Sequence, residues 1–358
     1  MKSSWTLFTI RGIAIRIHAT FLLLLVWFAA SGWMENQRIA DAAASVALVV
    51  GVFGCVVLHE LGHAAAARRY GVGTVDITLL PIGGVARLQG APPTPRAEIV
   101  IALAGPAVNV AIAAALWAFT PADLGALRDA DDPSLWAELL AINLTLAAFN
   151  LIPAFPMDGG RVLRALLALR YPAPRATQLA AWVGQVIAIG FAMVGLLRYP
   201  MLVLVAIFVW FGAAAEAAEA QLRGAIAGVA LRDVLITHFI ALAPGQTLAA
   251  AVAATLAGTQ KDFPVVDGER LVGVLTQARL LEALRQRGDA ATIEDWMERA
   301  VATADIGEAL EQVWQRIGTG RARLIAVLDQ GRLAGLVDIE HVAELVRIRS
   351  AIAAAVRR

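Results

Sequence analysis

The sequence predicts a polytopic α-helical membrane protein with six transmembrane helices, followed by a C-terminal cytoplasmic α/β region. Hydrophobic residues make up 59% of the 358 residues, against about 45–50% in a typical soluble protein. Charged residues make up only 16%, against about 25%. The apolar excess is confined to residues 1–222, and the rest has the composition of a soluble domain. The apolar part is therefore expected to lie in lipid.

Net charge and cysteine content argue against two classes of protein. The formal net charge is +1, so no overall positive field attracts nucleic acid, and we expect no nucleic-acid partner. Cys55 is the only cysteine, so the chain has no disulfide framework. The partners we expect are the lipid bilayer and other membrane proteins.

Six apolar stretches set the number of predicted transmembrane helices. A helix needs about 20 mostly apolar residues to cross a hydrocarbon core of roughly 30 Å. One such stretch could be a buried helix of a soluble protein, but six in succession are difficult to bury outside a bilayer. The stretches are residues 18–34, 43–66, 97–119, 136–153, 178–197 and 200–219.

The first stretch also has features of a secretory signal peptide. Basic residues precede it, and Ala29 to Gly32 loosely imitates a cleavage site. However, the basic region would be unusually long for a signal peptide, and five further apolar stretches follow. We therefore interpret it as the first membrane span.

Arginine and lysine residues between the stretches predict the orientation, because cytoplasmic connections carry an excess of them. Eleven lie in residues 1–17, 67–96 and 153–176, including Lys2, whereas the alternate connections contain only Arg38, Arg128 and Arg198. This alternation places both termini in the cytoplasm. The expected location is the cell inner membrane.

An internal repeat occupies the C-terminal region. Val265–Gly273 aligns with Val327–Gly335 at an offset of 62 residues. Each copy has the pattern of a helix, two strands joined by a tight Asp/Gly turn, and another helix. The expected preceding helices are Thr247–Leu256 and Ile306–Ile317. The predicted domains are residues 1–222, 231–285 and 292–348.

Within the second apolar stretch, His59-Glu60-Leu61-Gly62-His63 is the main candidate for a metal site. Residues four apart share a helix face, so both imidazoles can reach one zinc ion, and Glu60 can activate water. The alternative is two packing histidines with an uninvolved glutamate. Three ionisable side chains in one turn at membrane depth are costly without a function, which favours the metal site.

A catalytic zinc ion commonly has three protein ligands, so His59 and His63 leave one to be found. The second and fourth stretches run in the same direction, and the fourth leads into Asn150–Gly160, which brings Asp158 near the cytoplasmic side. The prolines and glycines there prevent a regular helix, and irregular backbone at membrane depth is tolerated where it lines a cavity. Asp158 is therefore the candidate third ligand; the alternative is that it only begins a cytoplasmic loop.

Three motifs in this order resemble the site-2 proteases, which are intramembrane zinc metalloproteases. They are His59–His63, Ala104-Gly105-Pro106 with Asn109, and Asn150–Gly160. Leu80–Ala86 is similar to the re-entrant hairpin that this family has near the substrate entry, and Arg16–Thr20 is similar to the start of its first span. The resemblance covers about residues 10–220. It implies one zinc ion per chain.

In this resemblance His59, His63 and Asp158 bind the zinc ion, and Glu60 is the general base. The resemblance also implies that Asn150 holds the substrate backbone or the oxyanion.

Other readings of the polar residues stay open. Asn150 and Asn143 could instead form interhelical hydrogen bonds, which are common in membranes. For Gly105 and Pro106 we expect packing and a helix kink rather than chemistry.

The repeat resembles a tandem pair of CBS domains over about residues 231–348. In that family the segment after the second strand often reads Gly-x-x-Thr-x-x-Asp, and the last residue binds a nucleotide ribose. Here Arg279 and His341 stand in the Asp position, and Asp338 replaces the Thr of the second copy. An adenosine nucleotide at the pair therefore stays open, beside dimerisation or covering of the cytoplasmic face.

Two functions of different classes follow. The first is an intramembrane zinc metalloendopeptidase that cleaves a transmembrane segment of a membrane-protein substrate, with the CBS pair regulating it or forming a homodimer. The alternative is a transporter or channel gated by the pair, since carboxylates and histidines in a membrane also mark ion paths. The complete His, Glu, His and Asp set disfavours a catalytically dead scaffold.

Overall fold

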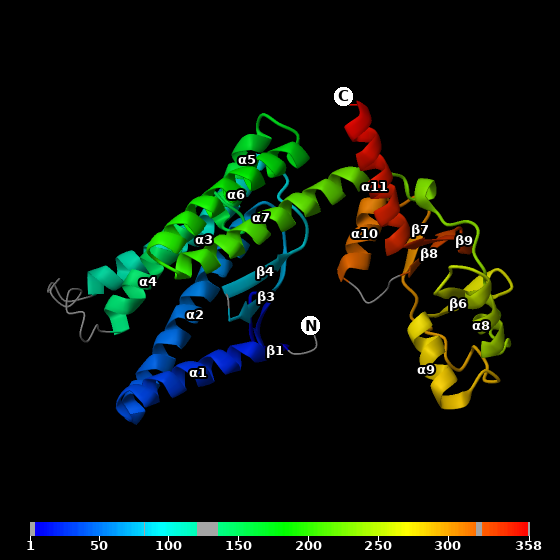
Figure 1. The fold of residues 1–358 in the computed structure, drawn as a ribbon, viewed down its shortest axis with the longest axis horizontal. Coiled ribbons are helices and arrows are strands. Elements are labelled where there is room, and N and C mark those ends of the chain that lie inside the picture. The colour runs from blue at the N-terminus through cyan, green and yellow to red at the C-terminus, as the bar shows by residue number, and fades with distance from the viewer. Residues whose placement is uncertain (1–3, 82, 120–134, 320–323, 357–358) are drawn as a thin grey trace. The chain divides into compact units, whose positions relative to one another are not determined.

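The computed structural model describes residues 4–81, 83–119, 135–319 and 324–356. The chain divides into two compact units, Met1–Ala220 and Gln221–Arg358 (Figure 1). Lys2 and Arg128, which entered the orientation argument, and Ile82 of the expected hairpin lie outside the described residues.

The first unit is mainly helical. Among the described residues, α2, α3, α6 and α7 are long and apolar enough to cross a membrane, and the apolar parts of α1 and α4 are shorter, at Ala19–Met34 and Leu135–Asn150. The prediction of a membrane protein is confirmed at the level of these four candidate spans. The helices are α1 (Ala19–Asn36), α2 (Ile39–Arg69), α3 (Pro95–Phe119), α4 (Leu135–Asn150), α5 (Asp158–Ala168), α6 (Ala173–Leu197) and α7 (Met201–Ile226).

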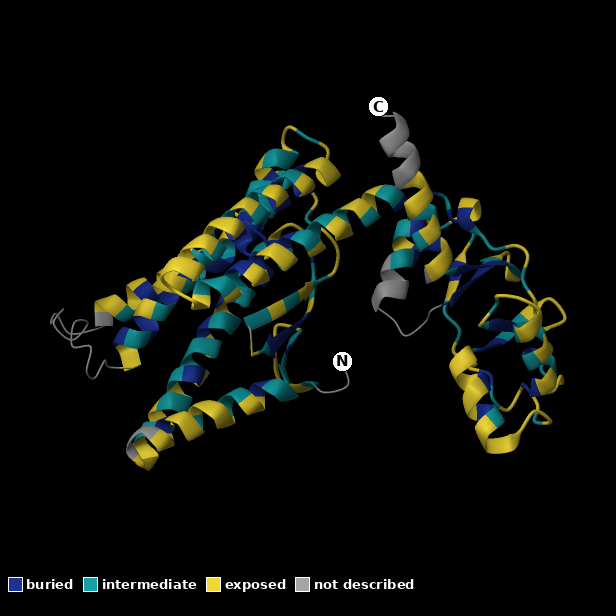
Figure 2. Ribbon diagram, viewed as in Figure 1, coloured by how far each residue is buried: buried dark blue, intermediate teal, exposed yellow. Residues whose placement is uncertain are grey.

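Large apolar side chains cover the outer faces of these helices. Trp27 of α1, Trp182 of α6 and Phe211 of α7 are each more than 60% exposed. Figure 2 shows exposed residues recurring along the whole length of these helices rather than only at their ends. A soluble protein rarely exposes so much contiguous apolar surface, so these faces are suited to lipid.

A four-stranded sheet accompanies the helices and was not predicted beyond one hairpin. Its strands, in the order β1-β2-β3-β4, are β1 (Ser4–Ile10), β2 (Ile13–His18), β3 (Thr74–Leu80) and β4 (Gly83–Leu88). The β1–β2 and β3–β4 pairs are antiparallel and β2–β3 is parallel, so the expected hairpin at Leu80–Ala86 is present as β3–β4. The strand β4 lies at one edge of the sheet.

Asp76 joins three strands of this sheet. Its side chain is completely buried and accepts hydrogen bonds from Arg87 of β4. It also forms an ion pair with Arg16 of β2, whose Nη1 lies 3.3 Å from Oδ2 of Asp76. A buried carboxylate is tolerated only when it is paired and hydrogen-bonded. Both guanidinium groups meet this requirement, and they tie β2 and β4 to the central strand β3.

The second unit contains two copies of one β-hairpin flanked by helices, as the repeat predicts. The first copy consists of α8 (Leu248–Ala257), β5 (Phe263–Asp267), β6 (Arg270–Leu275) and α9 (Gln277–Arg287). The second consists of α10 (Leu310–Thr319), β8 (Leu324–Asp329), β9 (Arg332–Asp338) and α11 (Ile339–Val356), with the additional strand β7 (Thr303–Asp305) before it. A register shift interrupts both hairpins at equivalent places, Val265/Val266 and Val327/Leu328.

One helix of the second copy begins later than predicted. The expected start was Ile306, but α10 begins at Leu310. The residues before it form β7 and a turn in which the Asp305 carboxylate accepts a hydrogen bond from the Gly307 amide. This hydrogen bond stabilises a turn in place of the first helical turn, so the helix begins later in the sequence. Aspartate side chains commonly compete with helical hydrogen bonds in this way.

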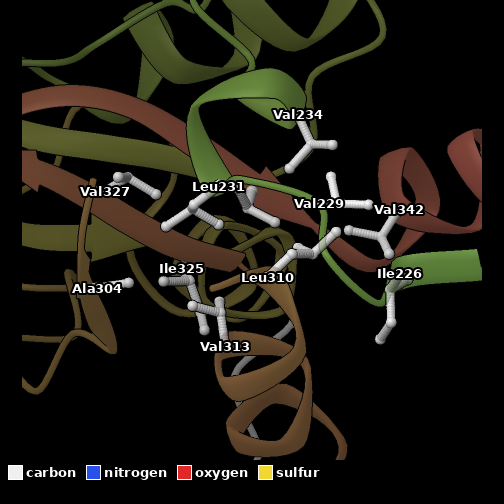
Figure 3. Packing of buried hydrophobic residues seen from close by; sticks show 11 residues of the cluster. Ile226, Val229, Leu231, Val234, Ala304, Leu310, Val313, Ile325, Val327 and Val342 are labelled. Atoms are coloured by element: carbon white, nitrogen blue, oxygen red, sulfur yellow. The ribbon is translucent and has the colours of Figure 1, made fainter. Parts of the chain in front are cut away.

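The two copies exchange the segments that precede them. Leu231 and Val234, in the short 3₁₀ helix η1 (Leu231–Val234), pack into the core of the second copy beside Leu310 and Val342 (Figure 3). At the 62-residue offset, Ile293 and Trp296 pack into the core of the first copy. Each core is therefore completed by chain that leads into the other copy.

Candidate metal centre

Two imidazoles lie on one face of α2, near its C-terminal end. His59 and His63 are buried, and their Nε2 atoms are 3.0 Å apart. Residues four apart are neighbours on a helix surface, which accounts for this approach. The structure thus brings together the two histidines that the sequence selects.

Asp158 meets both imidazoles from the start of α5. Its Oδ2 lies 3.2 Å from the Nε2 atom of each histidine. A helix N-terminus favours a carboxylate. Gly159 and Gly160 bring the helix start against the preceding loop, because a Cβ at either would overlap with backbone atoms of residues 151–155. The two glycines therefore help to hold Asp158 in this place.

The outer nitrogen of each imidazole has a hydrogen-bond acceptor. His63 Nδ1 lies 2.7 Å from the carbonyl oxygen of Ile101, and His59 Nδ1 lies 2.5 Å from Oδ1 of Asn109. A carbonyl oxygen can only accept, so each Nδ1 donates a proton, and the Nε2 of a neutral imidazole then carries a lone pair. Both lone pairs face Asp158.

When both rings are neutral, two imidazole nitrogens with lone pairs therefore converge on one carboxylate oxygen, a donor set that suits a metal cation. The three ligand atoms lie within 4.8 Å of one another. In a tetrahedral zinc site with bonds of about 2.0–2.2 Å, neighbouring ligand atoms lie roughly 3.3–3.6 Å apart. The observed 3.0 and 3.2 Å are close to this. His59, His63 and Asp158 thus fit the donor set and the spacing that a zinc ion would need.

Gly105 of α3 borders the same space. A Cβ at this position would lie 2.6 Å from His59 Nε2 and nearer still to His63 Nε2. The sequence suggested packing and a kink here, but the structure shows in addition that the missing side chain leaves room at the ligand atoms. Only glycine leaves that room.

Glu60 stands beside the three ligand atoms without being one of them. It is half-buried and faces the edge strand β4, since a Cβ on Gly84 would lie 2.9 Å from Glu60 Cγ and 3.3 Å from its Oε1. The carboxylate is therefore in contact range of β4, and it belongs to the same turn of α2 as the two imidazoles.

The two asparagines of α4 have different surroundings. Asn143 is completely buried, and its Oδ1 accepts a hydrogen bond of 2.8 Å from Nδ2 of Asn109. Asn150 is half-buried at the end of the helix, and its side chain has no hydrogen bond with another residue in the described part of the chain. The interhelical alternative thus fits Asn143, whereas the amide of Asn150 stays available.

Sequence reasoning did not find the contacts that α3 makes with the histidines. Ile101, Gly105 and Asn109 are spaced by four residues and so lie on one face of α3. A polar residue and a glycine at this spacing in an apolar span are the signal that could have shown this face. The carbonyl of Ile101 has no signal in the sequence, because every residue has one.

Comparisons with known proteins place the chain in a family. The sequence profile of peptidase family M50 matches residues 47–125 and 122–193, and that of the CBS domain matches residues 231–286. A zinc metalloprotease from Methanocaldococcus jannaschii is 32% identical over 339 residues, which are 94% of each chain. The chain belongs to peptidase family M50. The resemblance to the site-2 proteases is confirmed.

This M50 protease is also similar to a solved structure and to a sporulation protein. The solved structure of a site-2 protease from Methanocaldococcus jannaschii is 41% identical and covers 60% of this chain and 95% of that one, with a TM-score of 0.44. The stage IV sporulation protein FB of Bacillus subtilis is 30% identical over 125 residues, 35% of this chain and 41% of that protein.

The family match and the relative that is 32% identical identify the activity. The chain is a membrane-embedded zinc metalloprotease with a CBS domain. The comparisons give no support to a transporter or channel.

Proposed function

We propose that His59, His63 and Asp158 of this protease hold one zinc ion, and that the site hydrolyses a peptide bond within a transmembrane segment of another protein. The observation that supports this most is the triangle formed by Nε2 of His59, Nε2 of His63 and Oδ2 of Asp158, whose sides are 3.0 and 3.2 Å long. A zinc ion held there supplies Lewis acidity, which activates water near neutral pH and polarises the scissile carbonyl.

Glu60 acts as the general base. It takes the proton of the attacking water at a carboxylate oxygen and delivers it to the leaving amine. Its position supports this role, because the carboxylate lies on the same helix turn as the two imidazoles but is not one of the three converging atoms.

Asn150 binds the substrate. Its amide can donate a hydrogen bond to the oxyanion or to the substrate backbone, and no other described residue occupies that donor. A preorganised donor of this kind contributes about 3–4 kcal/mol to a transition state.

The substrate lies as an extended strand along β4. This strand forms one edge of the sheet, and Gly84 within it is in contact range of Glu60. An exposed edge can pair with an added strand through main-chain hydrogen bonds, and a peptide bond must leave its helix before water can attack it. Substrates N-methylated beside the cleaved bond should then be cut more slowly, whereas equal rates would exclude strand pairing.

All six apolar helices cross the membrane, and the active site opens toward the cytoplasm. This adds α1 and α4 to the four candidate spans. The eleven-to-three distribution of basic residues supports cytoplasmic termini.

The CBS pair regulates the protease or associates two copies of it, and it does not bind nucleotide in the usual way. Arg279, in place of the ribose-binding Asp, is already paired with Glu282 at 3.1 Å and Glu298 at 3.6 Å. Asp338 caps α11 through the amide of His341, as Thr276 caps α9. Calorimetry of the full-length protein with ATP, ADP and AMP should show no micromolar binding; such binding to any of them would overturn this proposal.

The decisive experiment for the function is a cleavage assay with purified protein. The full-length protein in detergent is incubated with a panel of single-span membrane proteins, with and without a zinc chelator. Cleavage that the chelator abolishes and added zinc restores is the expected result. Chelator-insensitive cleavage would exclude the metal centre as the catalytic site.

A further inference from the structure

A chain of buried amides connects α4 to the proposed metal centre. Asn143 Nδ2 donates to the carbonyl oxygen of Leu139 at 2.8 Å. Asn109 Nδ2 donates to Asn143 Oδ1 at 2.8 Å, and Asn109 Oδ1 accepts from Nδ1 of His59 at 2.5 Å. Both asparagines are completely buried. The chain Leu139–Asn143–Asn109–His59 is called the amide relay below.

The direction of every hydrogen bond in the amide relay follows from one fixed end. The carbonyl oxygen of Leu139 can only accept, so the NH₂ group of Asn143 must face it, and its oxygen must face Asn109. Asn109 then presents its NH₂ group to Asn143 and its oxygen to His59. An imidazole facing an oxygen must donate, so the proton of neutral His59 lies on Nδ1.

This direction determines which nitrogen of His59 can bind a metal ion. A proton on Nδ1 leaves the lone pair on Nε2, the atom that lies 3.2 Å from Asp158. If the Asn109 amide were reversed, its NH₂ group would face Nδ1 and favour the other tautomer, in which Nε2 carries the proton and cannot be a ligand.

We propose that Asn109 and Asn143 are positioning residues that hold His59 in its metal-binding tautomer. This rests on the proposed zinc site, and it gives Asn143 a role without contact to substrate. The membrane context supports it, because buried amides in apolar helices are costly unless every donor and acceptor is satisfied. His63 needs no such relay, since its partner is the carbonyl of Ile101, which cannot reverse.

The amide relay predicts different results for two substitutions at one position. Asn143→Leu removes the acceptor for Asn109, whose amide is then free to reverse. Neutral Asn143→Asp retains both hydrogen bonds of the amide relay, because its hydroxyl can donate to Leu139 and its carbonyl oxygen can accept from Asn109. It gives up only the contact of 3.3 Å that the Asn143 amide makes with Sγ of Cys55. Outer partners of metal-bound histidines typically contribute 10–100-fold to metal affinity. We expect a loss of about tenfold or more for Asn143→Leu and at most about threefold for Asn143→Asp.

The test measures zinc affinity of the metal-free full-length protein by competition with a chromophoric chelator, together with the visible spectrum of the cobalt form. Asn143→Ala removes the same groups without added atoms and serves if Asn143→Leu does not fold. Thr145→Val is the matched control, because Thr145 lies on the same helix and is exposed, and among the described residues its hydroxyl donates only to the carbonyl of Ala141.

The outcomes separate this proposal from the zinc site itself. We expect Asn143→Leu to bind zinc more weakly and to have an altered cobalt spectrum. Asn143→Asp and Thr145→Val should stay near wild type in both measurements. Lower thermal stability of Asn143→Leu with unchanged zinc affinity would show a purely structural role and overturn the proposal. A wild-type protein that binds no zinc would overturn the zinc site as well.

Discussion

At the scale of single residues, we expect the space at Gly105 to decide whether the proposed zinc ion can bind. A methyl group there would lie 2.6 Å from His59 Nε2, so Gly105→Ala should lower zinc affinity by about 100-fold, the upper range for groups around metal ligands. Metal analysis after dialysis measures this. Gly54→Ala on α2 is the control, since its added Cβ would meet nothing within 4 Å. Full zinc occupancy in Gly105→Ala would show that the ion sits elsewhere.

Glu60 and Asp158 are both acidic residues of the site, yet they should respond differently to amide substitution. Glu60→Gln keeps all three proposed ligands, so zinc should stay bound while cleavage falls by about 10²–10⁴-fold, the usual contribution of a general base. Asp158→Asn should lose zinc and activity together. Cleavage rate and metal content are measured on the same samples. Substantial proteolysis by Glu60→Gln would exclude the base assignment.

At the scale of elements, one arginine ties three helices of the first unit together. Arg164 of α5 donates to Glu98 of α3, lies 3.5 Å from Glu216 of α7, and stacks 5.6 Å above the ring of the buried Phe155. Arg164→Met leaves the Glu98 carboxylate without this cation, which should lower the free energy of unfolding by about 1–3 kcal/mol. Thermal unfolding in detergent measures it, with the exposed Arg170→Met as control. Equal shifts in both variants would contradict this.

The sheet should lose stability in acid through Asp76. The hydrogen bond from Arg87, helped by Arg16, holds the pKa of Asp76 below its ordinary value. Because the pKa is lower in the folded state, the carboxylate stabilises the fold above an unfolded pKa of about 3.9, and this disappears as the pH falls through the folded pKa. Asp76→Asn should therefore unfold at a lower temperature than wild type near neutral pH, and the gap should narrow below about pH 4. A gap independent of pH would contradict the assignment.

Elements also show what could be predicted from sequence. The apolar helices, the repeat and the two histidines follow from local patterns, namely the length of the apolar stretches, an offset and a spacing of four. Asp158 follows from the direction in which the second and fourth stretches run. The sheet formed by β1 to β4 does not, because β2 pairs with β3 across two intervening helices. Likewise, the contact of Asn109 with His59 joins residues 50 apart through helix packing, for which a single sequence carries no direct signal.

At the scale of the whole molecule, the topology can be tested directly. Six spans with cytoplasmic termini place residue 125 outside and residue 165 inside the cell. Reporter enzymes fused after these residues should therefore report opposite sides of the membrane, since the basic residues of 153–176 favour the cytoplasm. The same reading from both fusions would exclude the six-span topology.

The exchanged segments of the CBS pair have a consequence for how this region unfolds. A chain cut between the copies would deprive the first copy of Ile293 and Trp296, and its own Leu231 and Val234 would have no core to enter. Half of the pair is thus not an independent folding unit. Loosening one core withdraws side chains from the other, so the two copies should melt in a single transition. A substitution that loosens either core should in this way destabilise both.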